Sequence, residues 1–143
     1  QTLRSEDPRA FELLSSHCAR YAYSGAANVH LESRRPIIEV STDGELLAVR
    51  MNNRSIAPIT DVPFDEMESY YAAYRAFEAI LARPQMLVTF KLEAGECFVV
   101  DNTRVLHSRL AFSGVGERWL QGCYADREGL YSTIATESVK ETI

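Results

Sequence analysis

The stretch from residue 101 to 126, DNTRVLHSRLAFSGVGERWLQGCYAD, contains two side chains that can act together on a small molecule. His107 is one of only three histidines, and a neutral imidazole is a good ligand for iron, zinc or copper. Arg118 follows it, and its planar guanidinium can hold a carboxylate through two parallel hydrogen bonds. A metal ligand beside a carboxylate clamp suggests a chelating 2-oxo acid.

His107 also has a purely structural interpretation. Its neighbours are Val105, Leu106 and Leu110, so it can be a core or half-buried histidine whose ring is satisfied by a backbone carbonyl. Arg118 favours the metal-ligand interpretation, because it begins the next apolar stretch and an antiparallel return would bring its guanidinium near the end of the same sheet. The sequence around His107 therefore leaves both interpretations open.

Composition limits the classes of protein to consider. The 143 residues suffice for one domain, and 46% hydrophobic with 24% charged residues is typical of a globular chain. The net charge of −5 and scattered basic residues argue against a nucleic-acid partner, and no apolar run is long enough for a membrane span. Cys18, Cys97 and Cys123 show no C-x-x-C spacing, so we expect reduced thiols in a cytoplasmic protein.

The N-terminal half predicts two helices and a hairpin. Asp7 and Pro8 are typical of a helix start, so a helix is expected over 8–16. Asp43-Gly44 indicates a tight turn between strands at 36–41 and 45–51. A longer helix is expected between Pro63 and Pro84, since apolar residues recur there at helical spacing. Its expected buried face comprises positions 64, 67, 70, 71, 74, 77, 80 and 81.

The C-terminal half changes to short apolar runs separated by turn residues. Four strands are expected, over 86–92, 97–101, 105–112 and 118–126, followed by a helix within 127–138. This pattern is typical of an antiparallel sandwich or barrel.

The segments FKLEAGECFVVDNTRVLHSR and ERWLQGCYADREGLYS resemble the C-terminal portion of the γ-butyrobetaine and trimethyllysine hydroxylases, a branch of the Fe(II)/2-oxoglutarate-dependent dioxygenases. The resemblance continues through PRAFELLSS, PIIEV, VRMNN and DVPFDEMESYYAAYRAF. The family normally has Trp in place of Thr103 and Gly in place of Ser108. The resemblance implies a mainly β fold with flanking helices, as a single domain over 1–143 that forms the C-terminal part of a double-stranded β-helix, or jelly roll.

The resemblance also implies roles for individual residues. His107 matches the distal histidine of the 2-His-1-carboxylate iron site, and Arg118 matches the arginine that binds 2-oxoglutarate. Tyr124 matches a tyrosine of the aromatic cage around a trimethylammonium group, and Asn52 matches the asparagine that meets the substrate carboxylate, with Asn53 as a one-residue alternative. The structural alternatives are a core tyrosine at 124, a turn residue at the end of a strand at 52, and solvated surface cations at 104 and 109. The implied cofactor is Fe(II), 2-oxoglutarate is the co-substrate, and ascorbate is a further candidate.

Part of the family's iron site has no match here. The family's H-x-D pair comes before the helix expected at 8–16, and no such pair is present. His30 and Glu32 form the nearest substitute, an H-x-E pair. The preferred hypothesis is that the chain is the C-terminal portion of a longer oxygenase. Half a jelly roll would leave sheet edges exposed, so we expect a homodimer or another association through those edges.

The expected function is hydroxylation of a small trimethylammonium substrate, and GCYAD favours γ-butyrobetaine, which gives L-carnitine. Trimethyllysine is the alternative substrate. Two other classes stay open: a non-catalytic β-rich module that binds a dicarboxylate, and a cupin-like metal protein with a different ligand set. Three histidines without an H-x-H pair make the cupin-like alternative the poorer one.

Overall fold

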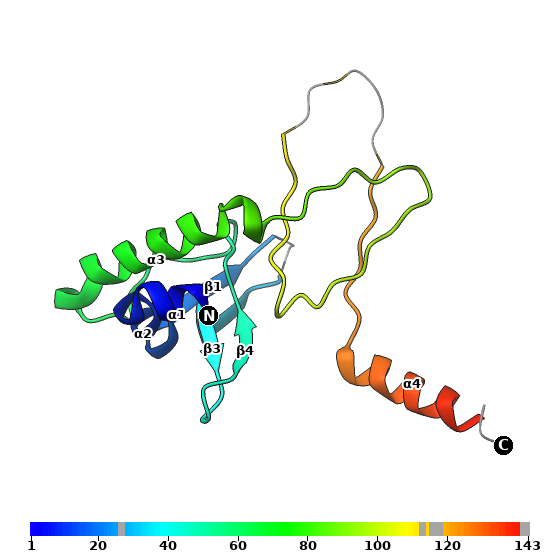
Figure 1. Cartoon of the computed structure of the whole chain (residues 1–143), viewed down its shortest axis with the longest axis horizontal. Helices are drawn as coiled ribbons and strands as arrows, with labels where there is room; N and C mark the ends of the chain where they lie inside the picture. The colour runs from blue at the N-terminus through cyan, green and yellow to red at the C-terminus, as the bar shows by residue number, and fades with distance from the viewer. Residues whose placement is uncertain (26–27, 112–113, 115–118, 141–143) are drawn as a thin grey trace. The chain divides into compact units, whose positions relative to one another are not determined.

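The computed structural model describes residues 1–25, 28–111, 114 and 119–140, with only the backbone of 138–140 (Figure 1). The chain divides into two compact units, Gln1–Ser108 and Arg109–Ile143. The single domain over 1–143 stays a prediction. Within the described ranges, no helix combines the length and the apolar character needed to cross a membrane.

Two short helices open the first unit, α1 (Thr2–Glu6) and α2 (Pro8–Ser16). The Asp7 carboxylate accepts a hydrogen bond of 2.9 Å from the amide of Ala10, and Pro8 occupies the first helical turn. The carboxylate satisfies an amide that the helix start leaves unpaired, and a proline at this position has no N–H that needs a partner. The helix predicted over 8–16 is confirmed.

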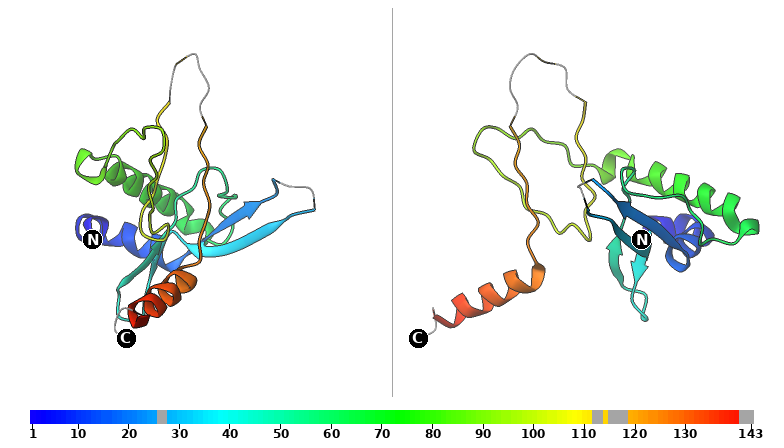
Figure 2. Two further views of the ribbon diagram at one scale, coloured as in Figure 1. Left: turned by 90° about the vertical axis from the view of Figure 1, so that its right-hand side faces the viewer. Right: turned by 180° about the vertical axis from the view of Figure 1, so that it is seen from behind.

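A two-stranded antiparallel ribbon follows, made of β1 (Cys18–Tyr23) and β2 (Leu31–Pro36) (Figure 2). The outer edge of β1 is bonded to a later segment of chain. The amide of Ala22 donates to the carbonyl of Ser55 at 2.8 Å, and the amide of Ala57 donates to the carbonyl of Arg20 at 2.9 Å. These bonds attach the ribbon to the segment after β4.

The second sheet pairs β3 (Ile38–Val40) with β4 (Leu46–Val49). Gly44 in the connecting turn has φ +84°, a left-handed conformation that glycine adopts without strain. Arg4 of α1 donates to its carbonyl at 2.8 Å. The predicted hairpin is confirmed, with strands shorter than the expected 36–41 and 45–51.

The long helix α3 (Met67–Leu81) lies between two 3₁₀ turns, η1 (Phe64–Glu66) and η2 (Pro84–Met86). The helix predicted between Pro63 and Pro84 is confirmed, but its buried face is narrower than expected. Phe64 is 95% exposed and Tyr71 is 43% exposed. Phe64 lies in the preceding 3₁₀ turn, which does not continue the helical spacing.

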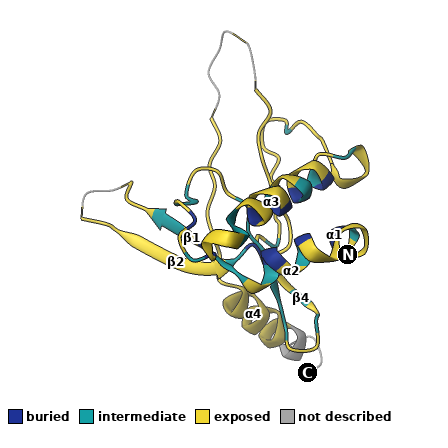
Figure 3. Ribbon diagram, turned by 90° about the vertical axis from the view of Figure 1, so that its left-hand side faces the viewer, coloured by how far each residue is buried: buried dark blue, intermediate teal, exposed yellow. Residues whose placement is uncertain are grey.

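The core of the first unit forms where α2 packs on α3 and on β3 (Figure 3). Apolar burial is the main favourable term in folding, so this layer holds the unit together. Its largest fully buried side chains are Leu13, Leu14, Ile37 and Tyr70.

The region from residue 87 to 126 differs from the prediction. None of its described residues belongs to a strand, although four strands were expected across residues 86–126. Val88 and Val99 are 88% and 89% exposed. The rings of Phe90 and Phe98 meet edge to face, with their centroids 5.7 Å apart. A strand needs a neighbouring strand to pair its backbone groups along its length, and the two sheets formed by the described residues include only β1 to β4. The four strands β1 to β4 and the helices beside them confirm a fold of short strands with flanking helices. The mainly β jelly roll stays a prediction.

The second unit ends in α4 (Arg127–Lys140). Asp126 caps it, because its carboxylate accepts from the amide of Gly129 at 3.1 Å. The helix expected within 127–138 is confirmed.

Candidate functional site

A tight turn immediately precedes His107. The Asp101 carboxylate accepts from the Thr103 amide at 3.0 Å and from its hydroxyl at 2.7 Å. The Asp101 carbonyl accepts from the amides of Arg104 and Val105, both at 3.0 Å. The carbonyl of Thr103 in turn accepts from the amide of Val49 in β4 at 2.8 Å. These bonds hold the backbone that leads to His107 against the second sheet.

His107 is exposed, as are its neighbours Val105, Leu106 and Leu110. The interpretation of His107 as a buried core histidine is therefore wrong. An exposed imidazole keeps both ring nitrogens accessible, so the role as a metal ligand stays a prediction. Arg104, interpreted as a solvated cation, is exposed but also donates to the carbonyl of Leu46 at 3.5 Å.

Asn52, three residues after the end of β4, closes a tight turn with its side chain. Its side-chain oxygen accepts from the amides of Arg54 at 2.9 Å and Ser55 at 3.3 Å. Its backbone carbonyl accepts from the amide of Ile56 at 3.1 Å. The interpretation as a turn residue is confirmed. Because backbone amides only donate, the atom facing them must be the oxygen, and the Nδ2 group faces away from them.

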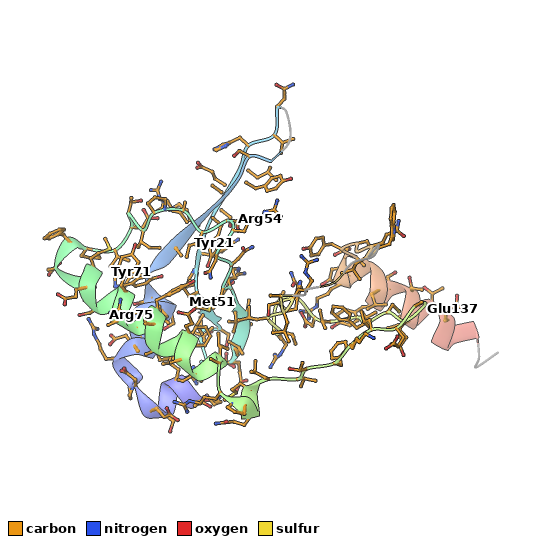
Figure 4. All side chains as sticks on the ribbon, turned by 90° about the horizontal axis from the view of Figure 1, so that it is seen from above. Tyr21, Met51, Arg54, Tyr71, Arg75 and Glu137 are labelled. Atoms are coloured by element: carbon orange, nitrogen blue, oxygen red, sulfur yellow. The ribbon has the colours of Figure 1, made fainter. Side chains whose placement is uncertain are left out.

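The neighbouring Asn53 is tied to the long helix. Tyr74 of α3 donates from its hydroxyl to Oδ1 of Asn53 at 3.2 Å, and burial raises the pKa of Tyr74. Figure 4 labels Met51 and Arg54, the residues on either side of the two asparagines. The helical spacing of the sequence predicts Tyr74 only as one position on an apolar helix face, so its link to Asn53 is a finding of the structure.

Arg118 lies outside the described residues, so its predicted position is not tested. Trp119 and Tyr124 belong to the second unit. Trp119 and Tyr124 are 85% and 87% exposed. The interpretation of Tyr124 as a core tyrosine is therefore wrong, and its ring face is available to a cation.

The H-x-E alternative for the iron site is not supported. Nε2 of His30 lies 2.9 Å from Oε1 of Glu32, and both side chains are mostly exposed. In the part of the chain that the structure describes, no group of three or more His, Cys, Asp or Glu side chains is placed to hold a metal. His30, Glu32 and His107 all lie in that part, so they do not meet. The described residues thus do not form a complete facial iron site, which needs three protein ligands.

One carboxylate binds side chains from both strands of the β1–β2 ribbon. Asp61 accepts from Arg20 at 3.0 and 2.9 Å and from Arg34 at 3.0 Å. These hydrogen bonds lower the pKa of Asp61, and the bond from Arg20 has the largest effect. Burial raises the pKa of Tyr21 on the same ribbon to about 12, and its hydroxyl donates to the carbonyl of Arg50 at 3.4 Å. The ribbon therefore supports both ends of the segment that carries Asn52.

The three cysteines form no disulfide with one another in the structure, and their reduced state stays a prediction. Cys18, Cys97 and Cys123 are free, and the latter two are exposed.

Comparison with known families gives the class of the protein. The model of the taurine catabolism dioxygenase TauD, TfdA family matches residues 1–124. The chain belongs to this dioxygenase family.

Individual relatives narrow the comparison further. A gamma-butyrobetaine dioxygenase from Pseudomonas sp. (strain AK-1) is 37% identical over 94% of this chain and 35% of its own length. The Homo sapiens gamma-butyrobetaine dioxygenase is 30% identical over 94% of this chain and 36% of its own length. A mitochondrial trimethyllysine dioxygenase from Gallus gallus is 36% identical over 93% of this chain and 32% of its own length. The chain thus spans about a third of the length of these curated relatives.

Proposed function

We propose that this chain forms the distal-histidine part of an Fe(II)/2-oxoglutarate-dependent dioxygenase that hydroxylates γ-butyrobetaine to L-carnitine. The observation that carries the proposal is the match to gamma-butyrobetaine dioxygenases across 94% of the chain, within a family of dioxygenases. The exposed imidazole of His107, on a backbone held by β4, supports the assignment of one iron ligand. The other two ligands are expected from another part of the polypeptide or a second chain.

The proposed substrate contacts follow from the chemistry of a zwitterion. A trimethylammonium group cannot donate a hydrogen bond, so an aromatic face such as that of Tyr124 is its natural partner, contributing about 0.5–2 kcal/mol per contact. The carboxylate at the other end needs N–H donors, and the Nδ2 group of Asn52 is one. Holding both ends would set which carbon faces the iron.

Arg118 is proposed to bind the distal carboxylate of 2-oxoglutarate. Turnover by the natural polypeptide that carries these residues tests this role. Arg118→Ala should raise the KM for 2-oxoglutarate about 10- to 100-fold, the usual cost of losing hydrogen bonds to a charged group. Arg75→Ala, an exposed cation on α3, is the matched control and should leave that KM unchanged. An unchanged KM in Arg118→Ala would contradict the role.

Trimethyllysine is the second candidate substrate, because a trimethyllysine dioxygenase matches the chain at 36% identity. The same assay, run with γ-butyrobetaine and with trimethyllysine, distinguishes the two by the ratio of kcat/KM. A preference for trimethyllysine would overturn our choice. A non-catalytic dicarboxylate-binding module would instead bind 2-oxoglutarate equally with and without Fe(II) and form no succinate.

A further inference from the structure

We infer that Tyr74 is a positioning residue for the substrate carboxylate: it holds the turn of residues 52–55 so that the Nδ2 group of Asn52 points outward. The inference rests on the proposed function, and it goes beyond it by adding a residue on α3 that touches neither substrate nor iron.

The first step concerns the turn itself. The oxygen of Asn52 is committed to the amides of Arg54 and Ser55. This leaves Nδ2 as the only polar atom of that side chain able to contact a ligand, and Nδ2 is a donor. Asn52, Asn53 and Arg54 are all exposed, and the Arg54 guanidinium is a further donor in the same turn. Two such donors in one exposed turn suit an anionic group such as a carboxylate.

The second step concerns what holds the turn in place. Its backbone is bonded to β1 through Ser55 and within itself through Ile56. Tyr74 adds a side-chain hydrogen bond of 3.2 Å to Asn53, across 21 residues of sequence. Tyr74 packs against the core, one helical turn from the fully buried Tyr70. A core-packed helix thereby limits rotation of the Asn53 side chain and of the turn that carries it.

The third step concerns the consequence for binding. An exposed turn that samples several conformations presents the Asn52 amide in the right orientation for only part of the time, and this weakens the apparent affinity. The Tyr74 bond is therefore expected to change the KM for the substrate. The kcat at saturation and the KM for 2-oxoglutarate should not change, because Tyr74 contacts none of the reacting groups.

The test combines hydrogen exchange and kinetics on the natural polypeptide that carries these residues. Tyr74→Phe should accelerate amide exchange in the peptide covering residues 51–57 about 3- to 10-fold, the cost of one neutral hydrogen bond. The KM for γ-butyrobetaine should rise by a similar factor. Tyr71→Phe is the matched control, because Tyr71 lies on the same helix (Figure 4) and is 43% exposed. It should change neither quantity.

A second pair of variants keeps the inference testable if Tyr74→Phe disturbs the helix. Asn53→Asp retains an acceptor for the Tyr74 hydroxyl and should preserve slow exchange, whereas Asn53→Ala should exchange as fast as Tyr74→Phe. Unchanged exchange in both Tyr74→Phe and Asn53→Ala would overturn the positioning role. Faster exchange with an unchanged substrate KM would show that the turn does not bind the substrate, which also overturns the inference. If the wild type turns over neither substrate, the proposed function fails, and the exchange comparison still decides the role of Tyr74 in holding the turn.

Discussion

Tyr70 on α3 combines complete burial with an unpaired hydroxyl. Its side chain is 0% exposed, and the hydroxyl finds no hydrogen-bond partner among the residues that the structure describes. Burial raises the pKa of this hydroxyl, so the group stays neutral at any ordinary pH. Its ring meets His17 edge to face, with centroids 6.4 Å apart. The ring thus contributes packing, whereas the hydroxyl carries a desolvation cost.

Removing that hydroxyl should therefore stabilise the protein. Tyr70→Phe is expected to raise the free energy of unfolding by about 1 kcal/mol, since it deletes a buried group that lacks a partner. Urea denaturation measures the change. Tyr71→Phe removes a hydroxyl from a half-exposed side chain and should leave stability unaltered. A Tyr70→Phe variant less stable than the wild type would mean that the hydroxyl is satisfied after all.

The site residues differ in how far the sequence alone could predict them. Asn52 was found by resemblance, and its turn chemistry is local, because the bonded amides are two and three residues away. Tyr74 was missed, because its partner lies 21 residues back and the helix pattern classed it with the apolar positions. Side-chain bonds between distant segments leave no periodic signal in a sequence.

At the scale of elements, the hydrogen bonds between the β1–β2 ribbon and Asp61 make the stability of the folded protein depend on pH. Arg20, and after it Arg34, lower the pKa of Asp61 below its ordinary value of 3.8. A carboxyl whose pKa is lower in the folded state stabilises the protein above its unfolded pKa, and this contribution is lost as the pH falls through the folded pKa. The ribbon should therefore loosen in acid.

Asp61→Asn tests this link. At neutral pH the variant should melt at a lower temperature than the wild type, because both arginines lose their charged partner. The difference should shrink as the pH falls below 3.8, where the wild-type carboxylate also becomes protonated. Asp65→Asn, an exposed acidic residue a few positions later, provides the control melt. A difference that stays constant through the acid range would argue against the pairing.

Elements with strong local signals were predictable. The Asp7-Pro8 start of α2, the Asp43-Gly44 turn and the spacing within α3 each depend on neighbouring residues, and each element formed as expected. The β1–β2 pairing was not predicted, because Arg20 and Arg34 break the apolar alternation. The four strands expected across residues 86–126 do not form among the described residues, for a different reason. Their sequences favour strands, but a strand also requires a partner, which the pattern of one segment does not reveal.

At the scale of the whole molecule, the segment from Leu87 to Val100 exposes apolar side chains. Their exposed fractions range from 38% for Val100 to 89% for Val99. A backbone that belongs to no described sheet, together with exposed apolar side chains, favours pairing with another chain. We propose that isolated copies of this chain associate through this segment, as the predicted exposure of sheet edges implies.

Gel filtration over a range of concentrations tests the association. The chain should elute as a dimer or larger, and the double variant Val88→Lys with Val99→Lys should shift it toward the monomer, since charge on an exposed edge disfavours pairing. Phe64→Lys changes an equally exposed apolar residue outside the segment and should leave the elution unchanged. A wild-type chain that stays monomeric throughout would contradict the proposal.

The backbone hydrogen bond between Val49 and Thr103 has a consequence for how Asn52 and His107 are aligned. Val49 lies three residues before Asn52, and Thr103 lies four residues before His107, so the two proposed contact points share one reference position on β4. A thermal displacement of β4 would carry both in the same direction, and the interval between them would change less than either position does. The residue at position 103, four residues before the proposed iron ligand His107, need not be the tryptophan that is usual in the family for this to hold. The bond uses the carbonyl of Thr103, so any side chain at that position can preserve the spacing.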